Sequence, residues 1–172
     1  GADSGIGQLA RLVNAQDAVA ARRLLAEPPA DLHGLRGARD SALAKLISEG
    51  QGQAEGYGHY LRALQTLRPL DMEPLESPAW QAWAVAVLAA FDRFRLLCAL
   101  RKGDWGVAGL NGRVETELQR RGLIDPAHEW YEGRPVLVTR NDYGLGLMNG
   151  DIGIALYLPG NGSLLLAAAM MA

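Results

Sequence analysis

The stretch from residue 94 to residue 118, FRLLCALRKGDWGVAGLNGRVETEL, contains the clearest indication of the fold class. Its first seven residues form a nearly continuous apolar run, which is typical of a strand covered on both faces in a parallel sheet. A glycine-rich turn at residues 102–106 follows, and the next residues have the apolar spacing of a helix. Strand, turn and helix make half of a βαβ unit, so this stretch predicts an α/β fold.

The residues before this stretch are predicted to be helical. Asp3 or Ser4 can cap a first helix and Asp17 a second, and Pro28 with Pro29 ends the second. Their predicted inward-facing residues are Ile6, Leu9, Leu12, Val13, Leu24 and Leu25. One or two further helices are expected at residues 41–67, with Gly50, Gly52 and Gly56 weakening the middle.

The most regular helical pattern lies at residues 80–91. Apolar side chains recur there at the spacing of one helix face, which predicts a buried helix. These side chains are Trp80, Trp83, Ala84, Val87, Leu88 and Phe91.

After residue 134 the pattern changes to antiparallel β. Strands are predicted at residues 135–139, at 152–158 and from 163 onward, with a tight turn at 159–162. The apolar run at residues 164–172 is expected to be a strand that is cut short.

Composition and motif content exclude several classes of protein. The chain has 172 residues, 49% of them hydrophobic, and a net charge of −2. A single cysteine, Cys98, excludes an internal disulfide framework and a cysteine-rich zinc site. Neither Lys45 nor Lys102, the two lysines, lies in a GxxxxGK[ST] motif, so this chain carries no Walker A site. His33, His59 and His128 lack the spacing of metal ligands.

Local charge is more informative than the total. Residues 40–92 hold three basic and seven acidic side chains, whereas residues 93–121 hold seven basic and three acidic ones. The basic excess therefore lies on the predicted strand–turn–helix unit, where open α/β sheets bind their ligands. A solvated helix face is the alternative interpretation, and without other observations it is the favoured one.

Three segments resemble the RecD family, the α subunit of exodeoxyribonuclease V, a superfamily 1 DNA helicase. The first is DSGIGQLA at residues 3–10, and the second is LLCALRKGDWGVAGLN at residues 96–111. The third is WYEGRPVLVTRND at residues 130–142 together with NGDIGIA at residues 149–155. The segments occur in the family's order and at similar spacing, and the last two are the most specific.

The resemblance implies a fragment of the family's second motor domain. Residues 1–125 would be part of a RecA-like, P-loop-type α/β domain, helical over 1–92 and strand–turn–helix over 93–122. Residues 130–172 would begin a small antiparallel β insertion, a Src-homology-3-like barrel that is incomplete at residue 172. The family's Walker A loop and magnesium-binding motif precede the matched region, so ATP and Mg would bind elsewhere in the full-length protein and no cofactor would bind this fragment.

The resemblance also implies a function. The full-length protein would be an ATP-dependent 5′–3′ DNA helicase that works with two other subunits in DNA recombination and double-strand-break repair. We expect a cytoplasmic nuclease complex without membrane contact. The fragment would supply part of the single-stranded DNA track, would hold no catalytic residue and no metal, and would be inactive alone.

Six side chains are candidates for nucleic-acid contact: Arg101, Lys102, Asn111, Arg113, Arg140 and Tyr143. The first four lie on a turn and helix start that face DNA in the family, where amides and basic side chains can bind phosphate. Asn111 can instead brace the loop. Arg140 and Tyr143 pair a basic and a stackable side chain, which suits single strands.

Turn formation is the favoured role of four neighbouring polar residues, which are Asn141, Asp142, Asn149 and Asp151, together with Gly150. A function of another class is also open. Residues 1–92 are helical, net acidic and rich in alanine, which would suit a module that docks onto partner subunits.

Overall fold

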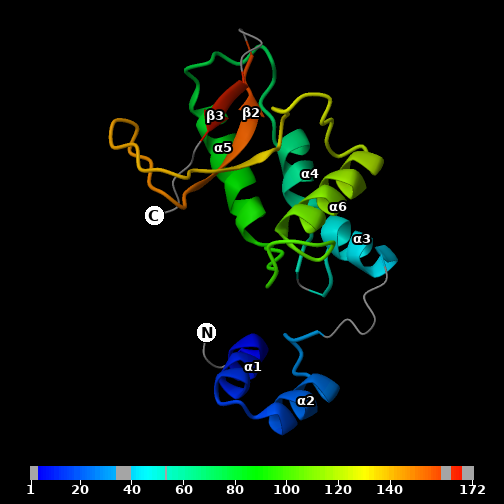
Figure 1. Cartoon of the computed structure of the whole chain (residues 1–172). Helices are drawn as coiled ribbons and strands as arrows, with labels where there is room; N and C mark the ends of the chain where they lie inside the picture. Colours follow the sequence, from blue (N-terminus) through cyan, green and yellow to red (C-terminus); the bar gives the residue numbers. More distant parts are fainter. Residues whose placement is uncertain (1–3, 34–39, 53, 160–163, 168–172) are drawn as a thin grey trace. The chain divides into compact units, whose positions relative to one another are not determined.

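Six helices and three short strands form the part of the chain that a computed structural model describes, residues 4–33, 40–52, 54–159 and 164–167 (Figure 1). The chain divides into two units, Gly1–Leu43 and Ala44–Ala172, and each is treated by itself. No helix in the described ranges is long and apolar enough to cross a membrane.

The first unit contains α1 (Gly5–Asn14) and α2 (Ala18–Ala26), which begin at the predicted caps. The Ser4 hydroxyl accepts a hydrogen bond from the Gly7 amide at 3.1 Å, and the Asp17 carboxylate accepts one from the Ala20 amide at 2.9 Å. The predicted inward face is only partly buried, because Ile6, Val13 and Leu25 are 67%, 60% and 42% exposed. Two short helices offer too little opposing surface to cover these side chains.

The core of the second unit is built on α4 (Gly58–Thr66) and α5 (Pro78–Asp92). All six side chains predicted to be inside α5 are buried, and Val87 has no exposed surface. The Ser77 hydroxyl caps α5 and Pro78 occupies its first turn, as proline can where no amide donor is needed. The Trp83 indole donates to the Leu64 carbonyl at 3.0 Å, which fixes α5 against α4.

Helices α3 (Asp40–Glu49) and α6 (Val107–Arg120) are linked by charged side chains. Buried Glu117 accepts hydrogen bonds from Arg120 at 2.9 Å and Arg121 at 2.7 Å, and Arg121 also reaches Glu49 at 2.7 Å. The bonds from Arg120 and Arg121 hold the pKa of Glu117 below its ordinary value. The carboxylate therefore stays ionised and keeps the end of α6 near α3.

The predicted strand at residues 94–100 is not formed. An isolated bridge between Leu100 and Gly106 is its sole strand-like pairing in the described residues, and Leu97 is 88% exposed. A strand needs a neighbour with which to exchange hydrogen bonds, and no other described segment lies beside residues 94–99 in register. The turn and the helix predicted after it are both present.

The observed sheet is antiparallel and small, with β1 (Pro135–Leu137), β2 (Ile152–Tyr157) and β3 (Leu164–Ala167) in that order. Val136 lies opposite Gly153, and Leu156 lies opposite Leu165. The three predicted strands are thus confirmed, with the first two slightly shorter. Most of the turn predicted at residues 159–162 falls outside the described residues.

The middle of β2 packs against α5, and Figure 1 shows β2 alongside this helix. Ile154, Ala155 and Leu156 are at most 1% exposed. The described residues therefore form helices and one small antiparallel sheet. Within the second unit, the buried side chains of the sheet and of the helices form one continuous core.

Arg68, just after α4, joins the helices to the sheet. Its guanidinium donates to the Glu132 carboxylate at 2.6 Å and to the Tyr157 carbonyl at 2.9 Å, and it lies 5.2 Å from the centre of the Trp83 ring. The same Glu132 oxygen accepts a hydrogen bond from the Tyr157 amide at 2.9 Å. One charge pair thus links α4, α5 and β2.

A second link between α4 and the segment before β1 is made at Gly133, the residue after Glu132. The Tyr60 hydroxyl, buried on α4, donates to the Gly133 carbonyl at 2.8 Å. Burial raises the pKa of Tyr60, so the hydroxyl keeps its proton. Gly133 has φ +86°, and a Cβ there would lie 2.7 Å from a Leu61 methyl, so this contact requires glycine.

Replacing Arg68 with Met should lower the free energy of unfolding by about 1–3 kcal/mol, because Glu132 then loses the partner that compensates its charge. Denaturant unfolding measures the change. Arg62→Met on α4 removes an exposed arginine that makes no ion pair with the described residues, and should change stability by less than about 0.5 kcal/mol. Equal losses in the two variants would contradict the assignment.

Candidate nucleic-acid interface

The turn before α6 carries two exposed cationic side chains. Arg101 and Lys102 are exposed and make no ion pair with the described residues. The Gly106 amide donates to the Gly103 carbonyl at 3.0 Å and the Val107 amide donates to the Leu100 carbonyl at 3.0 Å, which closes the turn. Gly103 has φ +84°, a conformation that other residues rarely adopt.

Two glycines hold this turn close to the helix. A Cβ on Gly106 would lie 2.5 Å from the Lys102 carbonyl oxygen, and one on Gly109 would lie 2.6 Å from the carbonyl oxygens of Gly103 and Asp104. These contacts are shorter than van der Waals separation, so the turn can approach α6 only where no side chain intervenes. Gly106 also leaves the helix start without a side-chain cap.

Arg113 lies on the side of α6 that faces the turn. Its guanidinium lies 4.9 Å from the centre of the Trp105 ring, a cation–π arrangement that orients both groups. Trp105 is 43% exposed, so a flat aromatic surface lies in the same turn as Arg101 and Lys102.

Asn111 is not part of this group. Residues 111 and 113 differ by about 200° around a helix, so their side chains leave α6 on nearly opposite sides. Asn111 lines a cavity of about 380 Å³ with Cys98, Tyr131 and Arg134. It makes no hydrogen bond that braces the loop within the described residues.

The other two candidates, Arg140 and Tyr143, lie on the loop between β1 and β2, which extends from the sheet in Figure 1. Arg140 is exposed and has no ion pair with the described residues. Tyr143 is 80% exposed, and its hydroxyl accepts a hydrogen bond from the Asn141 side-chain amide at 3.1 Å.

Turn formation by the polar residues of this loop is confirmed. The Asp142 carboxylate accepts from the Gly144 and Leu145 amides at 3.0 and 3.1 Å, and the Asn141 side-chain oxygen accepts from the Asn149 amide at 2.8 Å. The Asp151 carboxylate accepts from the Met148 amide at 2.7 Å. Gly150 takes φ +102°, as predicted for a turn.

Sequence reasoning missed Tyr131 and Arg134, which line the same cavity as Asn111. The Arg134 guanidinium lies 5.7 Å from the Trp130 ring centre and 5.9 Å from the Tyr131 ring centre. Burial raises the pKa of Tyr131. Two aromatics followed within four residues by an arginine were the available signal, and this pattern lies in the family-like segment at 130–142.

The known proteins that are similar to this chain are all subunits of one multi-subunit enzyme. Each of them is named RecBCD enzyme subunit RecD. The resemblance to the RecD family is thereby confirmed, and the chain is homologous to these subunits. No protein-family model matches it.

The extent of the similarity differs among the relatives. The Haemophilus influenzae protein is 31% identical over 159 residues, 90% of this chain and 24% of that protein. The Mycobacterium tuberculosis protein is 50% identical over 72 residues, and the Mycolicibacterium smegmatis protein 47% identical over 72 residues. Both shorter matches cover 42% of this chain. The chain spans about a quarter of the length of the first relative.

Replacing Gly109 with Ala should lower the free energy of unfolding by about 1–3 kcal/mol, because the methyl group would overlap the turn's carbonyl oxygens. Gly112 lies on the same helix, and apart from the neighbouring backbone of α6 no atom of the described residues lies within 4 Å of the position that a methyl group would take there. Gly112→Ala should therefore raise stability by up to about 1 kcal/mol. Thermal unfolding distinguishes the two signs. Stabilisation by both changes would mean that the turn does not lie close to α6.

Proposed function

We propose that this chain is part of a RecD-type ATP-dependent DNA helicase subunit of exodeoxyribonuclease V that acts in recombination and double-strand-break repair. The similarity over 90% of the chain to RecD of Haemophilus influenzae carries this proposal. The complete protein would move 5′ to 3′ along one strand and work with two other subunits. ATP and Mg would bind to parts of the complete protein outside residues 1–172.

We propose further that residues 1–125 belong to a RecA-like motor domain and that residues 130–172 begin a Src-homology-3-like insertion. Residues 94–100 would become a strand when a neighbour from the rest of the complete protein lies beside them. Their exposed Leu97 and missing hydrogen-bond partners within the described residues support this. The three antiparallel strands after residue 134 support a small β insertion.

The DNA-contacting part would be the turn of Arg101 and Lys102 with Trp105 and Arg113. Exposed cations bind phosphates without reading sequence, and a neighbouring aromatic ring can stack on an unpaired base. Arg140 and Tyr143 would add a second contact of the same kind from the β1–β2 loop. Asn111 would act differently, because it lies on the other side of α6.

A second function rests on a separate observation. From Pro78 to Ala90 no residue of α5 is charged, although its outward side includes Val85, which is 53% exposed. A helix that is apolar all round is normally covered on every side. This supports a docking role for the helical part of the chain onto another subunit.

Reversing both turn charges with Arg101→Glu and Lys102→Glu should lower the affinity of the complete subunit for single-stranded DNA about tenfold. It should also reduce the slope of log affinity against log salt by about 1.4, since two phosphate contacts are lost. Fluorescence anisotropy across a salt series measures both. The matched control, Arg22→Glu with Arg23→Glu, changes two exposed arginines of α2 and should leave the slope unchanged. Identical losses in the two variants would refute the DNA contact.

Residues 1–172 alone should hydrolyse no ATP, because the phosphate-binding loop with its lysine is missing from them. A coupled ATPase assay with single-stranded DNA tests this, with a complete RecD subunit as the positive control. Turnover above background that is retained through further purification would disprove the assignment of the ATP site to other parts of the protein.

A further inference from the structure

Each of the four tryptophans in the chain has an arginine guanidinium within 6.0 Å of its ring centre. Such cation–π pairs hold a flat ring in a fixed orientation. Burial separates the rings into two groups, because Trp80 and Trp83 are 4% and 2% exposed, whereas Trp105 and Trp130 are both 43% exposed. Trp105 and Trp130 therefore have ring surface that another molecule can reach.

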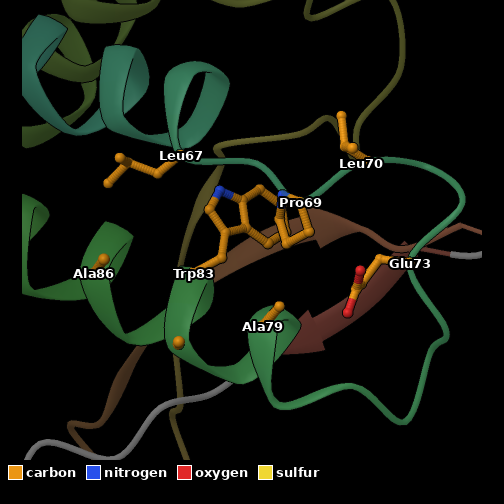
Figure 2. Close-up of a pocket in the computed structure, with 8 residues that line it drawn as sticks. Leu67, Pro69, Leu70, Glu73, Ala79, Trp83 and Ala86 are labelled. Carbon is orange, nitrogen blue, oxygen red and sulfur yellow. The ribbon is translucent and has the colours of Figure 1, made fainter.

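The Trp83 ring and Arg68 belong to the core of the second unit. Trp83 lines a hollow beside α5 together with Leu67 and Pro69, and Figure 2 shows these three side chains. The Trp83 indole donates to the Leu64 carbonyl at 3.0 Å, and the Arg68 guanidinium lies 5.2 Å from the ring centre. The contacts of this pair lie within the chain, so the pair has a structural role.

The two exposed rings differ in the charges that precede them. Residues 101–104, directly before Trp105, hold two basic side chains and one acidic side chain, all exposed. Residues 122–129, before Trp130, hold two exposed acidic side chains and no lysine or arginine. A polyanion is attracted to the first of these segments and repelled by the second.

Arg113 meets Trp105 because of its position on α6. Seven residues, about two helical turns, separate Arg113 from Gly106 at the start of the helix, so both lie on the same side. The guanidinium, half-buried, lies over the Trp105 ring at 4.9 Å from its centre. The backbone next to the ring is fixed as well, since the Gly106 amide donates to the Gly103 carbonyl at 3.0 Å. Arg113 covers one face of the ring, so a base that stacks on Trp105 must approach the other face.

From these observations we infer that Trp105 makes this turn specific for unpaired strands, and that Arg113 is a positioning residue for the ring rather than a phosphate contact. The inference rests on the proposed function, which supplies DNA as the ligand. Arg101 and Lys102 bind phosphates, which single strands and duplexes share. A ring stacks only on a base with an open face, and inside a duplex both faces of a base are covered by its neighbours. Charge thus supplies affinity for either form, and the ring supplies the preference for single strands.

A strand that lacks bases tests the role of the ring. In the complete subunit, Trp105→Ala should lower the affinity for oligothymidine about fivefold or more, because one stacked base is lost. The affinities for an abasic strand of the same length and for a duplex closed at both ends should not change, which also shows that the variant is folded. Trp105→Phe keeps an aromatic ring and should lose less. Fluorescence anisotropy measures each affinity.

Trp130→Ala is the matched control, because it removes an equally exposed ring that also lies near an arginine. It should change none of these affinities. Equal losses of Trp105→Ala on oligothymidine and on the abasic strand would overturn the inference. So would an unchanged affinity for oligothymidine, or a loss in Trp130→Ala as large as that in Trp105→Ala.

Arg113→Gln tests the positioning role. It should lower the affinity for oligothymidine about two- to fivefold, and should cause no further loss in the Trp105→Ala background, because Arg113 acts through the ring. The slope of log affinity against log salt should stay unchanged, whereas loss of a phosphate contact would reduce it by about 0.7. Lys102→Gln removes one charge from the same turn and should reduce the slope by that amount in either background. Additive losses in Arg113→Gln and Trp105→Ala, or a reduced slope in Arg113→Gln, would overturn the role given to Arg113.

Reversal of the two turn charges separates this inference from the proposed function. Arg101→Glu with Lys102→Glu should weaken the binding of oligothymidine, the abasic strand and the duplex alike. If it does so while Trp105→Ala changes no affinity, the inference alone is wrong. If the double reversal weakens none of the three, the proposed DNA contact is wrong and the inference fails with it.

Discussion

The second unit depends on one guanidinium group. Arg68 leaves α4, lies against Trp83 of α5 and binds both the Glu132 side chain and the Tyr157 main chain. Its side chain is half-buried, at 27% exposure, and the charge is compensated because the Glu132 carboxylate and the Tyr157 carbonyl oxygen both accept hydrogen bonds from it. The position of the sheet relative to the helices therefore follows from this arrangement and from the neighbouring Tyr60–Gly133 hydrogen bond.

Features that depend on neighbouring residues could be predicted from the sequence. The caps at Ser4 and Asp17 and the buried face of α5 are set by residues within one or two turns, and all are present. The strand expected at residues 94–100 would need a neighbouring strand from a distant part of the sequence. The apolar composition of these residues could not indicate whether that neighbouring strand lies in the described part of the chain. Arg68 and Glu132 are 64 residues apart, so no local pattern links them.

In the candidate site, too, the sequence did not predict which side chains lie together, even within one helix. The sequence analysis placed Arg101, Lys102, Asn111 and Arg113 in one group because the resemblance to the RecD family implies that this turn and helix start face DNA. Helical rotation separates Asn111 from Arg113 on α6. The Trp105 ring of the turn, which was not a candidate, lies 4.9 Å from the Arg113 guanidinium. Charge type could thus be read from the sequence, whereas the surface on which each charge lies required three-dimensional contacts.

The loop between β1 and β2 determines its own shape, since Asn141, Asp142 and Asp151 bind main-chain amides within the loop. The side chains at its tip, Tyr143 and Leu145, contribute little to that framework and are 80% and 74% exposed. Substitution at the tip therefore leaves the backbone frame intact, because the hydrogen bonds that define the frame come from other positions. Such a loop can acquire a different binding preference by exchanging one or two side chains, and the domain that carries it loses only the contact between Tyr143 and Asn141.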